Sequence, residues 1–142
     1  MGRSYWFECS KCGYRARVSG RADRGLNLSV QTILCQDCKE LFDAITRMRV
    51  PSEASFANSF RLGGAHGLRS LFSPRHSTKP PAFQVVVNRL PQFAASQFKW
   101  LQFKLQCPTS ALHRVESWSE PGKCPRCGVF LEKHALPYKI WE

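Results

Sequence analysis

The sequence lacks any long hydrophobic run. No apolar stretch approaches the roughly 18 residues that a membrane-spanning helix needs, and PPAFQVVV is the longest apolar-leaning segment. The N-terminal MGRSYWFECS has no apolar segment before a small-residue cleavage site, so we expect no secretory signal. Trp6 stands where a myristoylation signal requires Ser or Thr. We therefore expect neither a membrane span nor an N-terminal lipid anchor.

The motifs of common catalytic sites are also missing. The sequence contains no phosphate-binding loop and no Ser/His/Asp spacing typical of hydrolases. Zinc deaminases carry H-x-E before P-C-x-x-C, but Lys123 precedes Cys124, and Glu116 lies one position too far from His113. A thiol oxidoreductase needs one reactive C-x-x-C at the start of a helix, and the Gly-rich flanks here do not fit that setting. We expect no catalysis.

Acidic residues are scarce, with 10 Asp and Glu against 21 Lys and Arg, a formal net charge of +11. Metal-bound thiolates would reduce this excess to about +8, because a Zn(Cys)4 site sums to −2 and a Zn(Cys)3His site to −1. The remaining excess favours an acidic partner such as nucleic acid. No dense block of Lys or Arg focuses the charge on one segment.

Cysteine, by contrast, is abundant and ordered. Six of the seven cysteines form C-x-x-C pairs, and a single cysteine precedes the last pair: Cys9/Cys12, Cys35/Cys38, Cys107 and Cys124/Cys127. An odd count does not suit a disulfide framework, whereas thiolates two residues apart suit a tetrahedral metal. Thiolates favour zinc, with iron as the less favoured alternative. We expect structural Zn²⁺ and a reducing, cytoplasmic compartment.

The first four cysteines read C-x2-C-x22-C-x2-C. Short strands are predicted before the first pair, over 14–18 and over 26–34, while 41–50 fits either a strand or a helix and its β-branched residues favour a strand. This segment resembles a zinc ribbon, a small zinc-finger fold in which two knuckles pin a three-stranded sheet. We therefore predict an N-terminal module over residues 1–50 with the ligands Cys9, Cys12, Cys35 and Cys38.

Residues 51–81 are rich in Pro, Gly and Ser and are predicted to form an irregular connector. The connector also carries several Phe and Leu residues, which either dock on the flanking modules or become ordered on a partner.

Residues 82–142 are predicted to form a second, zinc-ribbon-like module. Strands are expected over 83–87 and 98–105, and the apolar tail is expected to pack back on the sheet. The knuckle CPRCG needs two further ligands, and Cys107 is the clear third. His113 is the preferred fourth ligand, which gives a Cys3His set of Cys107, His113, Cys124 and Cys127. The alternatives are His134 as the fourth ligand and a site that uses no histidine.

A different pairing remains open. ESWSEPGKCPRCG is similar to the second half of a rubredoxin and CSKCGY to the first half. This resemblance implies one iron held by Cys9, Cys12, Cys124 and Cys127. It would orphan Cys35 and Cys38, unless they recruit Cys107 and His113. Local pairing is preferred because long loop closure costs more, although only by about 1 kcal/mol, and because the distant pairing could orphan Cys35 and Cys38.

The expected fold is thus a small, β-rich, metal-stabilised fold of two zinc-ribbon-like modules joined by a connector. The ribbon resemblance implies a non-catalytic module that binds nucleic acid or a nucleoprotein assembly. Candidate phosphate contacts are Arg15, Arg17, Arg21 and Arg24. Tyr14 and Trp6 are candidates for base stacking, or else edge aromatics of a small sheet. Two alternatives remain: a protein–protein adaptor that binds through the connector and C-terminal tail, and an iron electron carrier.

Overall fold

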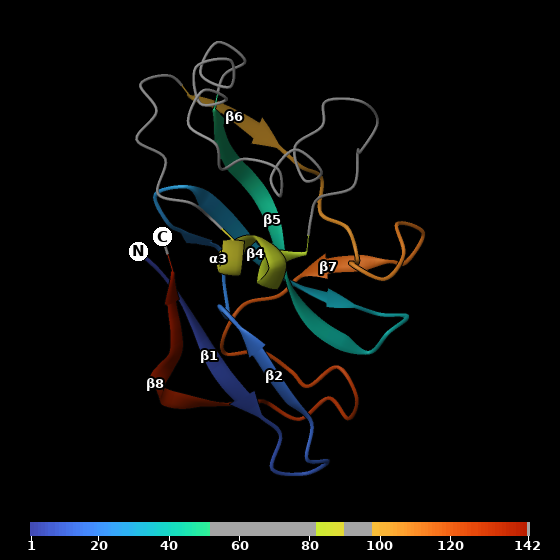
Figure 1. Cartoon of the computed structure of the whole chain (residues 1–142). Coiled ribbons are helices and arrows are strands. Elements are labelled where there is room, and N and C mark those ends of the chain that lie inside the picture. Colours follow the sequence, from blue (N-terminus) through green and yellow to red (C-terminus); the bar gives the residue numbers. More distant parts are fainter. Residues whose placement is uncertain (52–81, 90–97, 142) are drawn as a thin grey trace.

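The computed structural model describes residues 1–51, 82–89 and 98–141. These residues form two antiparallel β-sheets and one short helix (Figure 1). Residues 52–81, which make up all but the first residue of the predicted connector, lie outside the described residues. No helix in the described ranges is long and apolar enough to cross a membrane.

The first sheet has three strands in the order β2-β1-β8. Strand β1 (Gly2–Glu8) lies in the middle, with β2 (Arg15–Val18) and β8 (Glu132–Trp141) on its two sides. The sheet therefore joins the N-terminal hairpin to the C-terminal tail. The tail does pack on a sheet, as expected, but on the N-terminal strand β1 rather than within the second predicted module. The alternation in 14–18 is also confirmed, because Tyr14, Ala16 and Val18 are buried while Arg15 and Arg17 are exposed.

The second sheet has the order β3-β4-β5-β6. Its strands are β3 (Asp23–Arg24), β4 (Leu28–Cys35), β5 (Glu40–Pro51) and β6 (Phe98–Gln102), and β7 (Val115–Ser117) pairs with the end of β4. Each sheet thus contains strands from the N-terminal part of the chain, up to residue 51, and from the C-terminal part, from residue 98 onward. The structure is a small β-rich fold, and two separate ribbon modules are not confirmed.

Strand β5 explains the mixed hydrophobic pattern of 41–50. Its pairing with β4 shifts register between Val30↔Ile45 and Ser29↔Arg47, which leaves Thr46 as an extra residue. An extra residue switches the side of the sheet that successive side chains face. Leu41 and Ile45 are buried before the bulge, and Met48 and Val50 after it. The bulge therefore gives the buried residues of one strand a spacing that resembles the face of a helix.

The strand expected over 83–87 is wrong. Residues Phe83–Arg89 form the helix α3 instead. Phe83 and Val86, three residues apart, are both buried against the second core cluster, where the Phe83 ring lies edge-on to Trp141 at 5.4 Å between ring centres. Packing at helical spacing overrides the β propensity of this valine-rich segment.

Two hydrophobic clusters hold the sheets together. One surrounds the knuckle cysteines and contains Phe7, Cys9, Tyr14, Ala16, Val18, Leu41, Trp118, Cys124 and Leu131. The other lies under α3 and contains Leu28, Val30, Ile45, Met48, Val50, Phe83, Val86 and Trp141. The cysteines of the first cluster are therefore part of a core as well as candidate ligands.

Candidate metal centres

The first cluster of candidate ligands joins the two ends of the chain. Cys9 and Cys12 lie in the loop after β1, and Cys124 and Cys127 lie in the loop before β8: together they can supply four sulfur ligands within 4.8 Å of one another. The Sγ atoms of Cys9 and Cys127 are 3.3 Å apart, and those of Cys12 and Cys124 are 3.6 Å apart. We call this cluster centre 1.

The two knuckles of centre 1 have the same backbone design. The N–H of Gly13 donates to the carbonyl of Cys9 at 2.9 Å, and the N–H of Gly128 donates to the carbonyl of Cys124 at 3.0 Å. Both glycines have positive φ, 69° and 76°, and an added Cβ at either position would meet no described atom within 4 Å. The left-handed backbone, rather than lack of space, therefore explains the glycine in each knuckle.

The second cluster joins the β4–β5 turn to the segment before β7. Its ligands are Cys35, Cys38, Cys107 and His113, again within 4.8 Å of one another. The Nδ1 atom of His113 lies 3.2 Å from the Sγ of Cys38 and 3.7 Å from that of Cys35, and the Sγ atoms of Cys38 and Cys107 are 3.7 Å apart. We call this cluster centre 2.

Both clusters fit a tetrahedral metal ion. Four thiolates around one Zn²⁺ at the usual Zn–S distance of about 2.3 Å lie about 3.8 Å apart along the tetrahedron edges. The measured sulfur–sulfur distances of 3.3–3.7 Å are close to this value and far longer than the roughly 2.05 Å of a disulfide. The two centres can therefore hold one metal ion each.

The grouping corrects the local pairing preferred from the sequence. Cys9 and Cys12 lie with Cys124 and Cys127 rather than with Cys35 and Cys38. Cys35 and Cys38 instead lie with Cys107 and His113, so the distant pairing leaves no cysteine orphaned. The preference was wrong because it counted the cost of loop closure and the risk of two orphaned cysteines against the distant pairing, whereas β1–β8 and β4–β7 pairing already bring the distant segments together.

The rival histidine lies elsewhere. His134 belongs to β8, and its Nε2 lies 3.6 Å from the Oε2 of Glu8 on the outer side of the first sheet. The structure thus brings His113, and not His134, to the remaining cysteines. His66 and His76, which we expect to be solvated, lie outside the described residues.

Backbone amides tune one thiol in each centre. The N–H of Cys12 lowers the pKa of the Cys9 thiol to about 7. Burial raises the pKa of Cys107, but the N–H groups of Ser110 and Thr109 outweigh it and hold the value at about 6. Burial and the neighbouring Cys35 and Cys107 raise the pKa of Cys38 to about 11. A metal binds the thiolate form of cysteine. The lowered pKa values of Cys9 and Cys107 favour this form at one sulfur in each centre.

Of the four candidate phosphate contacts, two share a surface. Arg15 and Arg17 project from the outer face of β2, opposite Glu8 and Trp6 of β1. Arg24 belongs to β3 of the other sheet, where its guanidinium lies 6.0 Å from the Trp100 ring centre, and Arg21 is exposed in the turn before β3. The structure therefore does not gather all four into one patch.

Sequence reasoning missed two side chains on that surface and beside it. Tyr138 of β8 lies against Trp6 with ring centres 5.6 Å apart, and Arg126 of the second knuckle stacks on Tyr14 at 4.9 Å. Both lie more than a hundred residues from the β2 hairpin, so only the pairing of β8 with β1 and the closure of centre 1 could have placed them there.

Comparison of the chain with protein-family models, with curated proteins and with solved structures gave no match.

Proposed function

We propose that this chain is a non-catalytic zinc-binding module that binds nucleic acid or a nucleoprotein assembly. The observation that carries the proposal is the exposed face of β2, where Arg15 and Arg17 project from a sheet anchored at centre 1. The net charge of +11 supports an acidic partner, since nucleic-acid affinity begins with neutralised phosphates.

The ligand sets favour structural zinc. Structural sites use four protein ligands and are rich in thiolate, whereas catalytic zinc keeps a position for water. Centre 1 can supply four sulfurs, and centre 2 three sulfurs and one imidazole nitrogen. In a fold this small, metal binding supplies much of the folding free energy, and the two ions hold the β2 surface in place.

Two measurements test the proposal. Native mass spectrometry with element analysis, on protein purified without added metal, should find two zinc ions per chain and seven reduced thiols. Binding to labelled oligonucleotides should weaken by orders of magnitude between about 50 mM and about 200 mM salt. A chain that holds zinc but binds no nucleic acid at low salt would not have the proposed function.

A second candidate function is electron transfer by one iron. It is favoured by the grouping of Cys9, Cys12, Cys124 and Cys127, which is the rubredoxin-like pairing, and by the exposure of Cys12 at the surface. Iron in centre 1 would colour the purified protein red. A colourless protein with two zinc ions excludes this alternative.

A further inference from the structure

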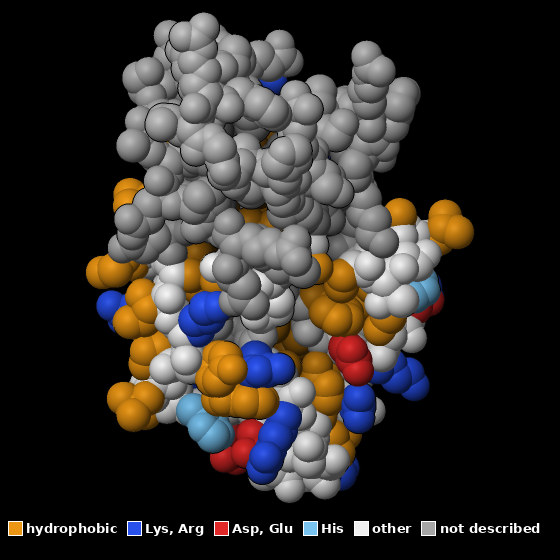
Figure 2. Space-filling model, in the orientation of Figure 1, with side chains coloured by type: hydrophobic (Ala, Val, Ile, Leu, Met, Phe, Trp, Pro, Cys, Tyr) orange, Lys and Arg blue, Asp and Glu red, His pale blue; other side chains and the backbone are white. Residues whose placement is uncertain are grey.

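The outer face of the first sheet carries a group of aromatic and basic side chains that the metal centres do not use. The guanidinium of Arg17 of β2 lies over two neighbouring rings, 5.1 Å from the centre of Trp6 and 5.3 Å from that of Tyr138, and the two ring centres are 5.6 Å apart. Its Nη1 donates a hydrogen bond of 3.1 Å to the Tyr138 hydroxyl. We call Trp6, Arg17 and Tyr138 the platform. It spans all three strands of the sheet, and Figure 2 shows hydrophobic and basic side chains side by side on this face.

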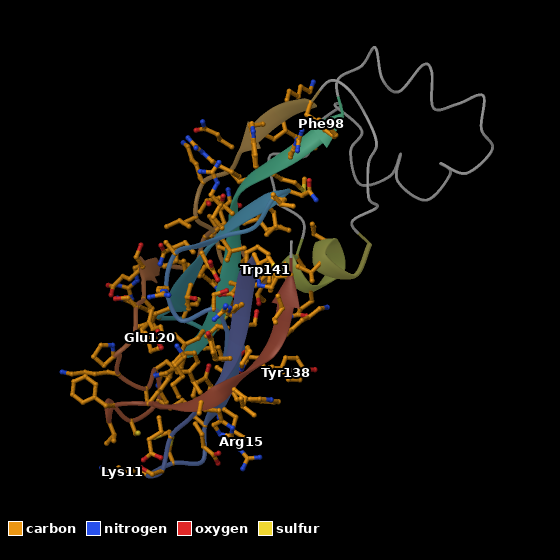
Figure 3. The ribbon with its side chains drawn as sticks, turned by 90° about the vertical axis from the view of Figure 1, so that its left-hand side faces the viewer. Lys11, Arg15, Phe98, Glu120, Tyr138 and Trp141 are labelled. Atoms are coloured by element: carbon orange, nitrogen blue, oxygen red, sulfur yellow. The ribbon has the colours of Figure 1, made fainter. Side chains whose placement is uncertain are left out.

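The platform is open to solvent. Arg17 is exposed, Tyr138 is 49% exposed and Trp6 is half-buried. Figure 3 shows Arg15 and Tyr138 on the same side of the sheet, while Glu120 lies on the opposite side. An aromatic pair on the solvent side of a sheet contributes less to the core than a buried pair, so its area is available to a ligand.

A groove of about 550 Å³ is lined by residues of β2 and β5 and includes two of the three platform residues, Trp6 and Arg17. Its lining also includes Arg15, Phe42 of β5 and Arg126, which belongs to the second knuckle of centre 1. Three arginines and several aromatic residues thus line one groove, together with Glu40 and Asp43. Rings and cations in one groove match a single strand, because bases stack on the rings while phosphates pair with the cations.

Arg15, Arg17 and Arg126 differ in whether a carboxylate pairs with the guanidinium group. Arg15 is paired with Glu8 at 2.7 Å, and Arg126 with Glu40 at 3.3 Å. Among the residues that the structure describes, no carboxylate pairs with Arg17. The guanidinium of Arg17 is therefore held in position by the two rings and keeps its charge for a phosphate.

We propose that the platform and the groove bind single-stranded nucleic acid, with bases stacked on Trp6 and Tyr138 and a phosphate paired with Arg17. This inference rests on the proposed function, because it names the form of nucleic acid and the surface that binds it. A duplex is the weaker ligand, since its bases are already stacked on one another and cannot reach the rings.

The test is fluorescence anisotropy with the full, metal-loaded chain and a labelled oligothymidine or oligouridine of about twelve nucleotides, within the range that one small domain covers. A duplex of equal length is the comparison. We expect the single strand to bind more tightly than the duplex. Trp6→Leu and Tyr138→Leu should each weaken binding about tenfold or more, while Trp6→Phe should stay within a few-fold of wild type because a ring is kept.

Arg17→Gln should weaken binding of every single strand about equally and should reduce the salt slope by about 0.7. Arg47→Gln is the matched control, since it removes the same charge from an exposed position of β5 that does not line the groove. Each variant must retain both metal ions by native mass spectrometry, so that lost affinity is not confused with lost fold.

The outcomes separate the two proposals. If wild type binds nucleic acid but the platform variants bind equally well, or if Arg21→Gln and Arg24→Gln alone weaken binding, the platform is not the site and nucleic-acid binding stands. Equal affinity for the duplex also overturns the platform. If wild type binds no oligonucleotide, the proposed function fails. Binding of a polyglutamate peptide in its place would assign the platform to an acidic protein partner and overturn the inference.

Discussion

The Sγ atom of Cys9 lies 3.3 Å from the Sγ atom of Cys127, although 118 residues separate the two in the chain. Centre 2 also joins residues that are far apart in the sequence, since Cys35 and His113 are separated by 78 residues. Each centre forms next to a strand pairing: Glu8 pairs with Glu132 just before Cys9, and Cys35 itself pairs with Val115 just after His113. The strands and the metal ligands therefore close the same long loops together.

This interleaving predicts which cysteines depend on each other. The double variant Cys9→Ser with Cys124→Ser damages centre 1 alone and should retain one metal ion, as should Cys35→Ser with Cys107→Ser, which damages centre 2 alone. Cys9→Ser with Cys35→Ser damages both centres and should retain none. Native mass spectrometry in the presence of a competing chelator measures the bound ions. Local pairing predicts the reverse, with one ion kept in the Cys9/Cys35 double variant.

Centre 2 has one nitrogen ligand that can be replaced by sulfur. His113→Ala removes the Nδ1 that lies 3.2 Å from Cys38, so one metal ion should be lost or bound far more weakly. His113→Cys should restore a four-ligand set and keep the ion. His134→Ala is the control, because His134 contacts Glu8 rather than a cysteine cluster. Loss of metal in the His134 variant with full retention in His113→Ala would contradict the assignment.

Much of the local structure could be predicted from the sequence. The knuckles CSKCG and CPRCG carry their own signature, because a glycine after the second cysteine supplies the positive φ seen at Gly13 and Gly128. The period-two pattern of 14–18 indicates a half-buried strand by itself. These features depend on a few neighbouring residues, and local chemistry is sufficient to predict them.

The pairing of the knuckles could not be predicted in the same way. Loop closure distinguishes near from distant partners by only about 1 kcal/mol, which strand pairing easily outweighs. The pairing of β8 with β1 brings the two knuckles together, but the sequence of β8 does not indicate this pairing. Its apolar residues Leu136, Tyr138 and Ile140 are exposed, so their pattern does not show which strand β8 pairs with. Helix α3 was missed for a similar reason: its valines favour a strand, and only the burial of Phe83 and Val86 in one cluster with Trp141 shows the helical spacing.

Gly122 is expected to support centre 1 through Trp118. A Cβ at position 122 would overlap the Trp118 indole ring, whose Nε1 donates a 3.1 Å hydrogen bond to the carbonyl of Lys123, next to Cys124. Gly122→Ala should therefore destabilise the fold by about 1–3 kcal/mol, as overpacking does, measured by chemical denaturation of the metal-loaded protein.

A double-mutant cycle separates overlap from other effects at this position. Trp118→Phe removes the indole atoms that the new Cβ would meet, so the added methyl should cost much less in the Trp118→Phe background than in wild type. If Gly122→Ala costs the same in both backgrounds, overlap with Trp118 is not the cause of the loss.

Asp43 links three strands through one carboxylate. It accepts hydrogen bonds from the Ser19 backbone N–H and hydroxyl, at the end of β2, and from the Thr32 hydroxyl of β4 at 2.7 Å. Asp43→Asn replaces one accepting oxygen by an NH₂ group that faces these donors. The variant should be less stable at pH 7 by about 1–3 kcal/mol, the cost of leaving a buried donor unpaired.

The same carboxylate predicts a pH dependence. Burial raises the pKa of Asp43 from 3.8 to about 6, with a further contribution from the charge of Asp23, and the hydrogen bonds from Ser19 and Thr32 only partly oppose it. The folded state therefore binds a proton at higher pH than the unfolded state, so this group adds stability as the pH falls through 6 toward 4 and loses it as the pH rises. Between pH 7 and pH 5.5 the gain should be about 1 kcal/mol in wild type relative to Asp43→Asn. Denaturation of both proteins with metal bound measures the difference, and Glu132→Gln, at an exposed position of β8, is the control that should follow wild type. A constant gap between wild type and Asp43→Asn across this range would mean that Asp43 does not titrate there.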